Sequence, residues 1–130
     1  MKKFTLIILI ISLPLLYGCR EVVVRYSDNG TTVHLVIDQI LKIELPGDAT
    51  SGSDWRKMAY NDSLLIKSGR PNYMLGDGGG GSPGVYYFRF KAIAAGSSKL
   101  YLEYGSKYDS DEKPLKKFEI TVIIHEKKEK

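Results

Sequence analysis

The chain has 130 residues, a length that allows one domain but no second hydrophobic core. Its formal net charge is +4, and removal of a leader carrying Lys2 and Lys3 would reduce this to +2. So small a positive excess gives no reason to expect nucleic acid or an acidic substrate as a partner. Cys19 is the single cysteine, so an internal disulfide is excluded and stability must come from packing.

The first nineteen residues are typical of an export signal. Two lysines precede an apolar run (4–16), which at about a dozen residues is shorter than the roughly 20 that a membrane-spanning helix needs. The run closes with Leu16-Tyr17-Gly18-Cys19, which resembles the lipobox of bacterial lipoproteins and implies lipidation of Cys19. The alternative is an ordinary buried thiol. We therefore expect a signal peptide (1–19), and a domain (20–130) that a lipid anchors in the bacterial cell envelope, in the periplasm or at the surface.

The rest of the sequence alternates between apolar and polar residues with the period of two that is typical of half-buried strands. In VYYFRFKA (85–92), Tyr86, Phe88 and Phe90 share one face. The other candidate strands are EVVVRYS (21–27), TTVHLVI (31–37), ILKIEL (40–45), WRKMAY (55–60), LLIKS (64–68), KLYLEY (99–104) and FEITVII (118–124). Turn-forming residues separate most of them, and no segment shows a convincing helical stripe. The pattern predicts an all-β, immunoglobulin-like β-sandwich of seven to eight antiparallel strands.

Three segments do not follow the strand pattern and are long for hairpin turns: 46–54, 73–84 and 105–114. In a sandwich, loops that follow alternate strands can gather at one end of the molecule. We therefore expect these loops to offer a binding surface.

The sequence lacks a set of residues suited to catalysis or metal binding. We interpret His34, in a predicted strand, and His125, after the last one, as surface or sheet-edge residues, and no zinc-type spacing is present. GDGGGG (76–81) matches a phosphate-binding motif formally, but a strand follows it where that motif needs a helix. The acidic run (109–112) lacks the further ligands of a calcium loop. We expect no cofactor, no metal and no enzymatic activity.

LPGDATSGSDW (45–55) resembles the first signature loop of the chagasin family of cysteine protease inhibitors, in which Asn-Pro-Thr-Thr-Gly-aromatic-x-Trp follows an apolar strand. GGSPGVYYFRFKAIAAGSSKLYLEY (80–104) is similar to the family's Gly-rich loop and the Phe-x-Phe strand that follows it. YGSKYDSDEKPLKKFEITV (104–122) is similar in spacing to its last loop, with Ser106, Lys107 and Tyr108 in place of Arg-Pro-Trp.

The resemblance implies a monomeric inhibitor that blocks the cleft of a papain-family cysteine protease with three loops and binds no nucleic acid. The residues that it assigns to these loops are Asp48, Ala49, Thr50, Ser51, Gly52, Ser53, Gly80, Gly81, Ser82, Pro83, Gly84, Ser106, Lys107 and Tyr108. Small residues in the first loop would let its backbone approach a catalytic thiol. Tyr108 is a candidate anchor, since aromatic residues often carry interface energy.

Two further interpretations accompany the resemblance. We expect Trp55 to pack in the core beneath the first loop rather than to contact a target directly. The alternative function is that of an immunoglobulin-like adhesion or assembly module, which has kept the fold but lost inhibitory activity.

Overall fold

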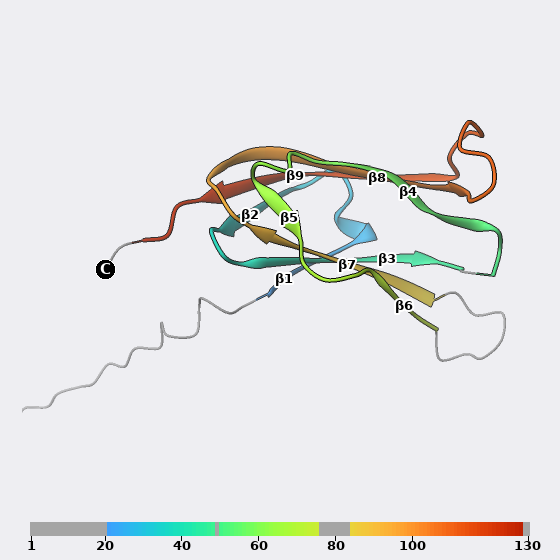
Figure 1. Cartoon of the computed structure of the whole chain (residues 1–130), viewed down its shortest axis with the longest axis horizontal. Helices are drawn as coiled ribbons and strands as arrows, with labels where there is room; N and C mark the ends of the chain where they lie inside the picture. The colour runs from blue at the N-terminus through green and yellow to red at the C-terminus, as the bar shows by residue number, and fades with distance from the viewer. Residues whose placement is uncertain (1–20, 49, 76–83, 129–130) are drawn as a thin grey trace, which may run out of the picture.

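The computed structural model describes residues 21–48, 50–75 and 84–128. This part of the chain forms two facing β-sheets (Figure 1). Its elements are β1 (Glu21–Arg25), a 3-10 helix η2 (Tyr26–Asp28), β2 (Thr32–Val36), β3 (Ile40–Gly47), β4 (Ser53–Ala59), β5 (Leu65–Lys67), β6 (Asn72–Met74), β7 (Gly84–Ala92), β8 (Gly96–Ser106) and β9 (Lys116–His125). Within the described residues, no helix is long and apolar enough to cross a membrane.

The prediction of an all-β sandwich is confirmed. One sheet has the strand order β1-β3-β7-β5, with the short β6 also paired to β7, and the other has the order β2-β9-β8-β4. The described residues thus hold nine strands, where seven to eight were expected, because β6 is a three-residue strand between turn-forming residues.

Two strand pairs are parallel rather than antiparallel, β1 with β3 and β2 with β9. Segments 21–27 and 31–37 do not pair as a hairpin, because η2 lies between them and β1 and β2 join different sheets. Each therefore lies beside a strand that runs in its own direction.

The core lies between the sheets and is built from alternate residues of the strands. In β7, every second residue from Gly84 to Ala92 is buried, which confirms the face predicted for Tyr86, Phe88 and Phe90. The largest of the described side chains with less than 2% exposure are Leu35, Leu41, Ile43, Leu45, Leu65, Phe90, Leu100, Leu102, Phe118, Ile120 and Val122. Burial of such side chains stabilises each by about 1.5–3 kcal/mol relative to exposure, so the strands form a firm base for the loops.

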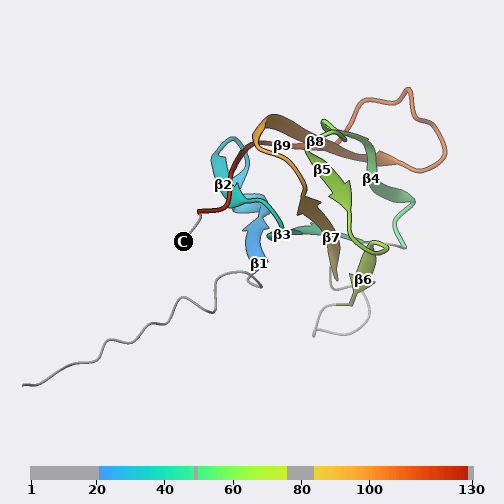
Figure 2. The same ribbon diagram turned by 60° about the vertical axis from the view of Figure 1, so that its left-hand side comes forward.

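The strand register brings the strand ends that flank the three predicted loop regions to one end of the sandwich. Gly47, the last residue of β3, pairs with Gly84, the first residue of β7. Ser53, the first residue of β4, pairs with Ser106, the last residue of β8. The end of β3 therefore lies beside the start of β7, and the start of β4 lies beside the end of β8, at the same end of the sandwich (Figure 1, right, and Figure 2).

Candidate functional site

The first loop, residues 48–52, is shorter than expected, because Pro46 and Gly47 belong to β3 and Ser53 and Asp54 belong to β4. Both strands extend into the predicted loop because their main chains find partners there, in β7 and β8. The remaining loop residues are small and partly or fully exposed where they are described.

Hydrogen bonds from its own side chains fix the turn in this loop. Asp48 Oδ1 accepts hydrogen bonds from the amide of Thr50 at 2.9 Å and from its hydroxyl at 2.7 Å. The amide and hydroxyl of Ser51 donate to the Asp48 carbonyl at 3.1 and 2.8 Å. The hydroxyl and then the amide of Thr50 lower the pKa of Asp48 below its ordinary value, so the carboxylate stays ionised. Aspartate commonly builds turns in this way.

Trp55 packs in the core beneath the first loop, as predicted. Its side chain is 7% exposed, and its ring centroid lies 5.2 Å from that of Tyr104. The indole Nε1 donates to the Pro46 carbonyl at 3.0 Å, and the hydroxyl of Tyr104 accepts from the Asp48 amide at 3.0 Å. These two bonds tie the end of β3 to β4 and β8, which holds the base of the loop.

The flanks of the second loop pack against the end of β3. The Tyr73 ring lies 4.7 Å from the Tyr86 ring, and the Tyr73 hydroxyl donates to the Gly47 carbonyl at 3.3 Å. A Cβ atom at Gly84 would overlap the Met74 carbonyl and the Tyr73 hydroxyl, so this position requires glycine. Of the residues predicted for the site, Ala49, Gly80, Gly81, Ser82, Pro83 and Cys19 lie outside the described residues.

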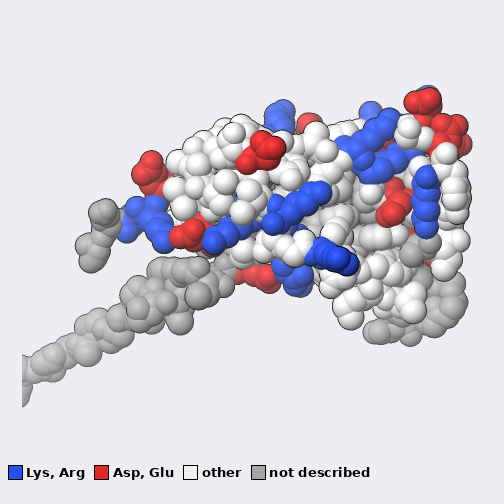
Figure 3. Space-filling view, viewed as in Figure 1, with Lys and Arg blue, Asp and Glu red and all other residues white. Residues whose placement is uncertain are grey.

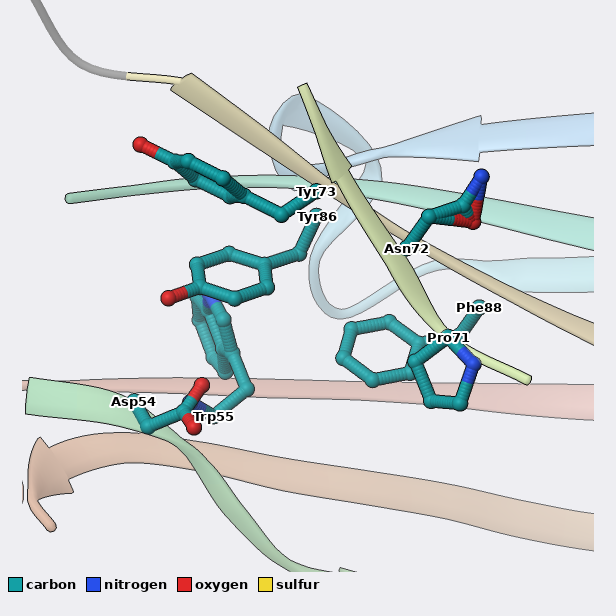
Figure 4. A pocket seen from close by; sticks show the side chains of 7 residues that line it. All are labelled: Asp54, Trp55, Pro71, Asn72, Tyr73, Tyr86 and Phe88. Carbon is teal, nitrogen blue, oxygen red and sulfur yellow. The ribbon is translucent and has the colours of Figure 1, made fainter. Parts of the chain in front are cut away.

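A cavity of about 210 Å³ lies behind these flanks, between β4 and β6. Figure 4 shows the rings of Tyr73 and Tyr86 on one side of it and Phe88 with Pro71 on the other. Burial, and secondarily the charge of Asp54, raises the pKa of the Tyr86 hydroxyl, which therefore stays protonated. A protonated phenol beside a carboxylate is not a poised base, so the cavity gives no support for catalysis.

Arg56, in β4, holds the third loop through three main-chain carbonyls. Its Nη1 donates to the carbonyls of Ser106 at 2.8 Å and Asp109 at 3.0 Å, and its Nη2 donates to the carbonyl of Glu112 at 2.6 Å. Its Nε donates to Glu103 Oε2 at 3.2 Å. The Arg56 side chain is only 12% exposed, whereas Asp109 and Glu112, two of the residues that it bonds, are exposed. A single guanidinium thus bridges both ends of the segment 106–112.

Glu103 anchors this arginine. It pairs with Arg56 in the β4–β8 register, and its carboxylate also accepts a hydrogen bond from the Tyr101 hydroxyl at 2.7 Å and lies 3.5 Å from Lys57 Nζ. The Tyr101 hydrogen bond, followed by the charges of Lys57 and Arg56, lowers the pKa of Glu103. Successive side chains of a regular strand point to opposite faces. Arg56 and Lys57 both reach Glu103 because the register shifts after Arg56 and Lys57 has a positive φ of 53°.

The first and third loops are joined directly. The Lys107 amide donates to the Gly52 carbonyl at 2.8 Å. Gly52 has a φ of +87°, which favours glycine, and a Cβ atom there would lie 3.5 Å from the Tyr108 ring. The Ser106 hydroxyl accepts from the amides of Tyr108 at 3.0 Å and Asp109 at 3.1 Å. The Tyr108 side chain remains 84% exposed, so it projects beside the first loop.

The structure therefore brings together the predicted site residues that it describes. Asp48, Thr50, Ser51, Gly52, Ser53, Gly84, Ser106, Lys107 and Tyr108 all lie at one end of the sandwich, with Ser53, Gly84 and Ser106 as strand termini. Acidic side chains cover the tip of the third loop, where Asp109, Asp111 and Glu112 are exposed (Figure 3, upper right). Sequence reasoning missed Arg56, because its partners in the third loop are main-chain atoms, which no residue type marks.

Comparisons with known proteins identify the family and the fold. Residues 34–122 match the profile of the chagasin family of peptidase inhibitors (I42). The crystal structure of the cysteine protease inhibitor EhICP2 from Entamoeba histolytica has a TM-score of 0.73 and 18% identity, over 82% of this chain and 97% of that one.

The solution structure of amebosin has a TM-score of 0.62 and 20% identity, over 82% of this chain and 99% of that one. No curated protein sequence matches significantly. At these identities the two structures establish the fold, whereas the profile spans more than two thirds of the chain. The chain belongs to the chagasin family of peptidase inhibitors, whose members inhibit proteases and are not enzymes.

Proposed function

We propose that the protein is a reversible inhibitor of papain-family cysteine proteases and occludes their active-site cleft with three loops. The observation that carries the proposal is the direct bond between two loops that are distant in sequence, from the Lys107 amide to the Gly52 carbonyl. Together with the flanks of the second loop, these segments form one end of a rigid scaffold. Family membership and the fold shared with a cysteine protease inhibitor support the same conclusion.

The first loop suits the floor of a cleft. Thr50 and Ser51 are small and exposed, and Gly52 has no side chain, so the backbone can come close to a reactive thiol. The hydrogen bond from the Ser51 amide to the Asp48 carbonyl closes a turn. A closed turn does not present the extended peptide that a protease cleaves, which explains how the loop would block the enzyme and remain intact.

The neighbouring loops supply contact area and stiffness. A stable interface buries on the order of 1,600 Å² in total, more than five small residues provide. Tyr108, at 84% exposure, is placed to act as an anchor at the rim. Because ordering a loose loop on binding costs free energy, the carbonyl bonds from Arg56 favour binding by holding the third loop beforehand.

The direct test is titration of the purified protein into papain with a fluorogenic substrate. Reversible and saturable loss of activity is expected, with no effect on trypsin as a serine protease control. Thr50→Arg should abolish this inhibition, since a long charged side chain would hold the loop out of the cleft. If a panel of papain-family enzymes keeps full activity, the inhibitor proposal fails and the adhesion or assembly module gains support.

We also propose that the protein is exported, acts as a monomer, and is held in the bacterial cell envelope by a lipid on Cys19. The lipobox-like residues 16–19 support export and lipidation, and the orientation of β1 fits an anchor that precedes this strand. Glu21 pairs with Ile40, whereas the loops lie beyond Gly47 at the other end of β3, about 23 Å away at 3.3 Å per residue. A lipid at Cys19 would thus leave the loops facing away from the membrane.

The anchor is tested by expressing the full chain in a bacterium and separating membranes from soluble protein. The wild type should stay with the membranes, and the mass of its N-terminal peptide should show an acylated cysteine. Cys19→Ser should move to the soluble fraction. An unmodified cysteine in the mature protein would overturn this part of the proposal.

A further inference from the structure

The two histidines of the chain meet on the outer face of a sheet, far from the loops. His34 Nδ1 and His125 Nε2 are 2.9 Å apart, and the rings are stacked with an interplanar angle of 16°. In the parallel β2–β9 pair, His34 is opposite Ile123 and His125 is opposite Val36, so the histidines are diagonal neighbours. Both side chains are exposed. Their surface position agrees with the sequence-based interpretation, but their contact across 91 positions was not foreseen.

We propose that His34 and His125 form a binding site for a divalent transition-metal ion, with Cu²⁺ and Ni²⁺ preferred over Zn²⁺. Neutral imidazole nitrogen is a common ligand for all three ions. Bonds from such metals to histidine nitrogen are about 2.0–2.1 Å long. Two bonds of this length at the right angle of a square-planar or tetragonal centre place their nitrogens about 2.9 Å apart. The observed separation of 2.9 Å meets that requirement.

The separation of the two ligand nitrogens also distinguishes Cu²⁺ and Ni²⁺ from Zn²⁺. A tetrahedral centre, which Zn²⁺ prefers, needs its ligand nitrogens about 3.3 Å apart at the same bond length. Zinc would therefore require the rings to move apart, whereas a tetragonal ion requires only that they turn. The hydrogen that lies between the rings moves by exchange with water to the outer nitrogen of its own ring, which leaves two lone pairs for the metal.

The surroundings of the pair allow an ion to bind. β2 is an edge strand of its sheet, so one side of the site is open and water can complete the coordination. Lys127, the nearest cation along the chain from His125, is paired with Asp38 at 2.7 Å, which offsets its repulsion of a metal ion. Among the described residues no third histidine, cysteine or carboxylate completes a cluster, so the protein supplies two ligands.

The location of the site predicts what metal binding does. His34 is in β2 and His125 is the last residue of β9. A bound ion would therefore cross-link two neighbouring strands that are far apart in the sequence. An ion that binds only the folded chain raises its stability. β9 begins near the loops, where Lys116 pairs with Tyr104, and it ends at His125. The metal site therefore lies at the opposite end of this strand from the loops, and metal binding should leave inhibition of a protease unaffected.

The experiment uses the full chain carrying Cys19→Ser and no affinity tag, so that neither the thiol nor added histidines bind metal. Calorimetric titration with CuCl₂, NiCl₂ and ZnCl₂ should show one saturable equivalent, tighter for copper and nickel than for zinc, and each bound ion should raise the melting temperature. His34→Gln and His125→Gln should each abolish the equivalent and the shift. Thr32→Val, on the same exposed strand, is the matched control and should retain both.

A measurement on the unaltered pair removes dependence on the folding of the variants. In NMR spectra, substoichiometric Cu²⁺ should broaden the ring signals of both histidines before other signals. Equal copper binding by the glutamine variants, broadening that spares either ring, or zinc binding as tight as copper binding would each overturn the proposal.

Discussion

Replacing Arg56 by methionine is expected to loosen the third loop while leaving the first loop in place. Methionine keeps much of the side-chain length but removes the three donations to the carbonyls of Ser106, Asp109 and Glu112. Glu103 is not left alone by this change, since Tyr101 and Lys57 still contact it. Two of the three bonds are to exposed residues, so we assign about 1 kcal/mol to each, or about 3 kcal/mol in all.

That free energy should appear in protease binding, because the variant must order the loop when the complex forms. A loss of about 3 kcal/mol corresponds to an increase of about 100-fold in the inhibition constant. The assay is inhibition of papain, together with hydrogen exchange of the amides of residues 107–113 in the free protein. Exchange should become faster in the variant, and the amides of β9 should keep their protection.

Arg56→Lys is the matched control. Lysine keeps the charge beside Glu103, but its single ammonium cannot span the three carbonyls that the guanidinium reaches, so an intermediate inhibition constant is expected. A purely structural role for Arg56 would lower the melting temperature without changing the inhibition constant of the folded fraction. Inhibition by Arg56→Met at the wild-type level would therefore refute the reasoning.

Three further predictions concern the loops and their support. Thr50→Arg should abolish papain inhibition while the melting temperature stays nearly unchanged, because Thr50 is exposed; a large drop in a thermal scan would show that the residue is structural. Gly47→Ala should destabilise the fold by about 1–3 kcal/mol in denaturant unfolding, since a Cβ atom would lie 2.7 Å from Tyr86 Cε2, and an unchanged midpoint would contradict this packing. The lowered pKa of Glu103 means that its stabilising effect is present above its ordinary value of 4.5 and is lost as pH falls through the lower folded value. The stability difference between wild type and Glu103→Gln should therefore shrink at acid pH in thermal scans, and a constant difference would count against an ionised Glu103.

The fold class was predictable because the core of a β-sandwich is built from every second residue of each strand, which gives the sequence an apolar period of two. Every second residue of β7 is buried, and β9 buries Phe118, Ile120, Val122 and Ile124 in the same way. The parallel pairs were not predictable, since the alternation in 21–25 and 32–36 says which face is buried but not which strand lies alongside. At three residues, β6 is too short to show a pattern.

The candidate site was predictable where the type of a residue is enough to indicate a loop or a core position. Small residues and one tryptophan marked the first loop, and Trp55 packs beneath it as expected. Contacts between residues that are distant in sequence could not be predicted from residue type. Arg56 donates to carbonyl groups up to 56 positions away, and His34 contacts His125 only because of the strand register. Loop boundaries were also too wide, because Gly47 and Ser53 complete ladders with Gly84 and Ser106.

The first loop lacks the proline of the family signature, which the resemblance aligns with Ala49. Proline stiffens a loop by fixing one backbone dihedral. Here Asp48 constrains the turn by accepting two hydrogen bonds from Thr50 and two more at its carbonyl from Ser51. Those from Thr50 also lower the pKa of Asp48 below 3.8, so the carboxylate that holds the turn stays ionised in mildly acidic solution. The hydrogen bonds that join Asp48 to Thr50 and Ser51 therefore constrain this turn through side chains and main chain, where a proline would act through its ring.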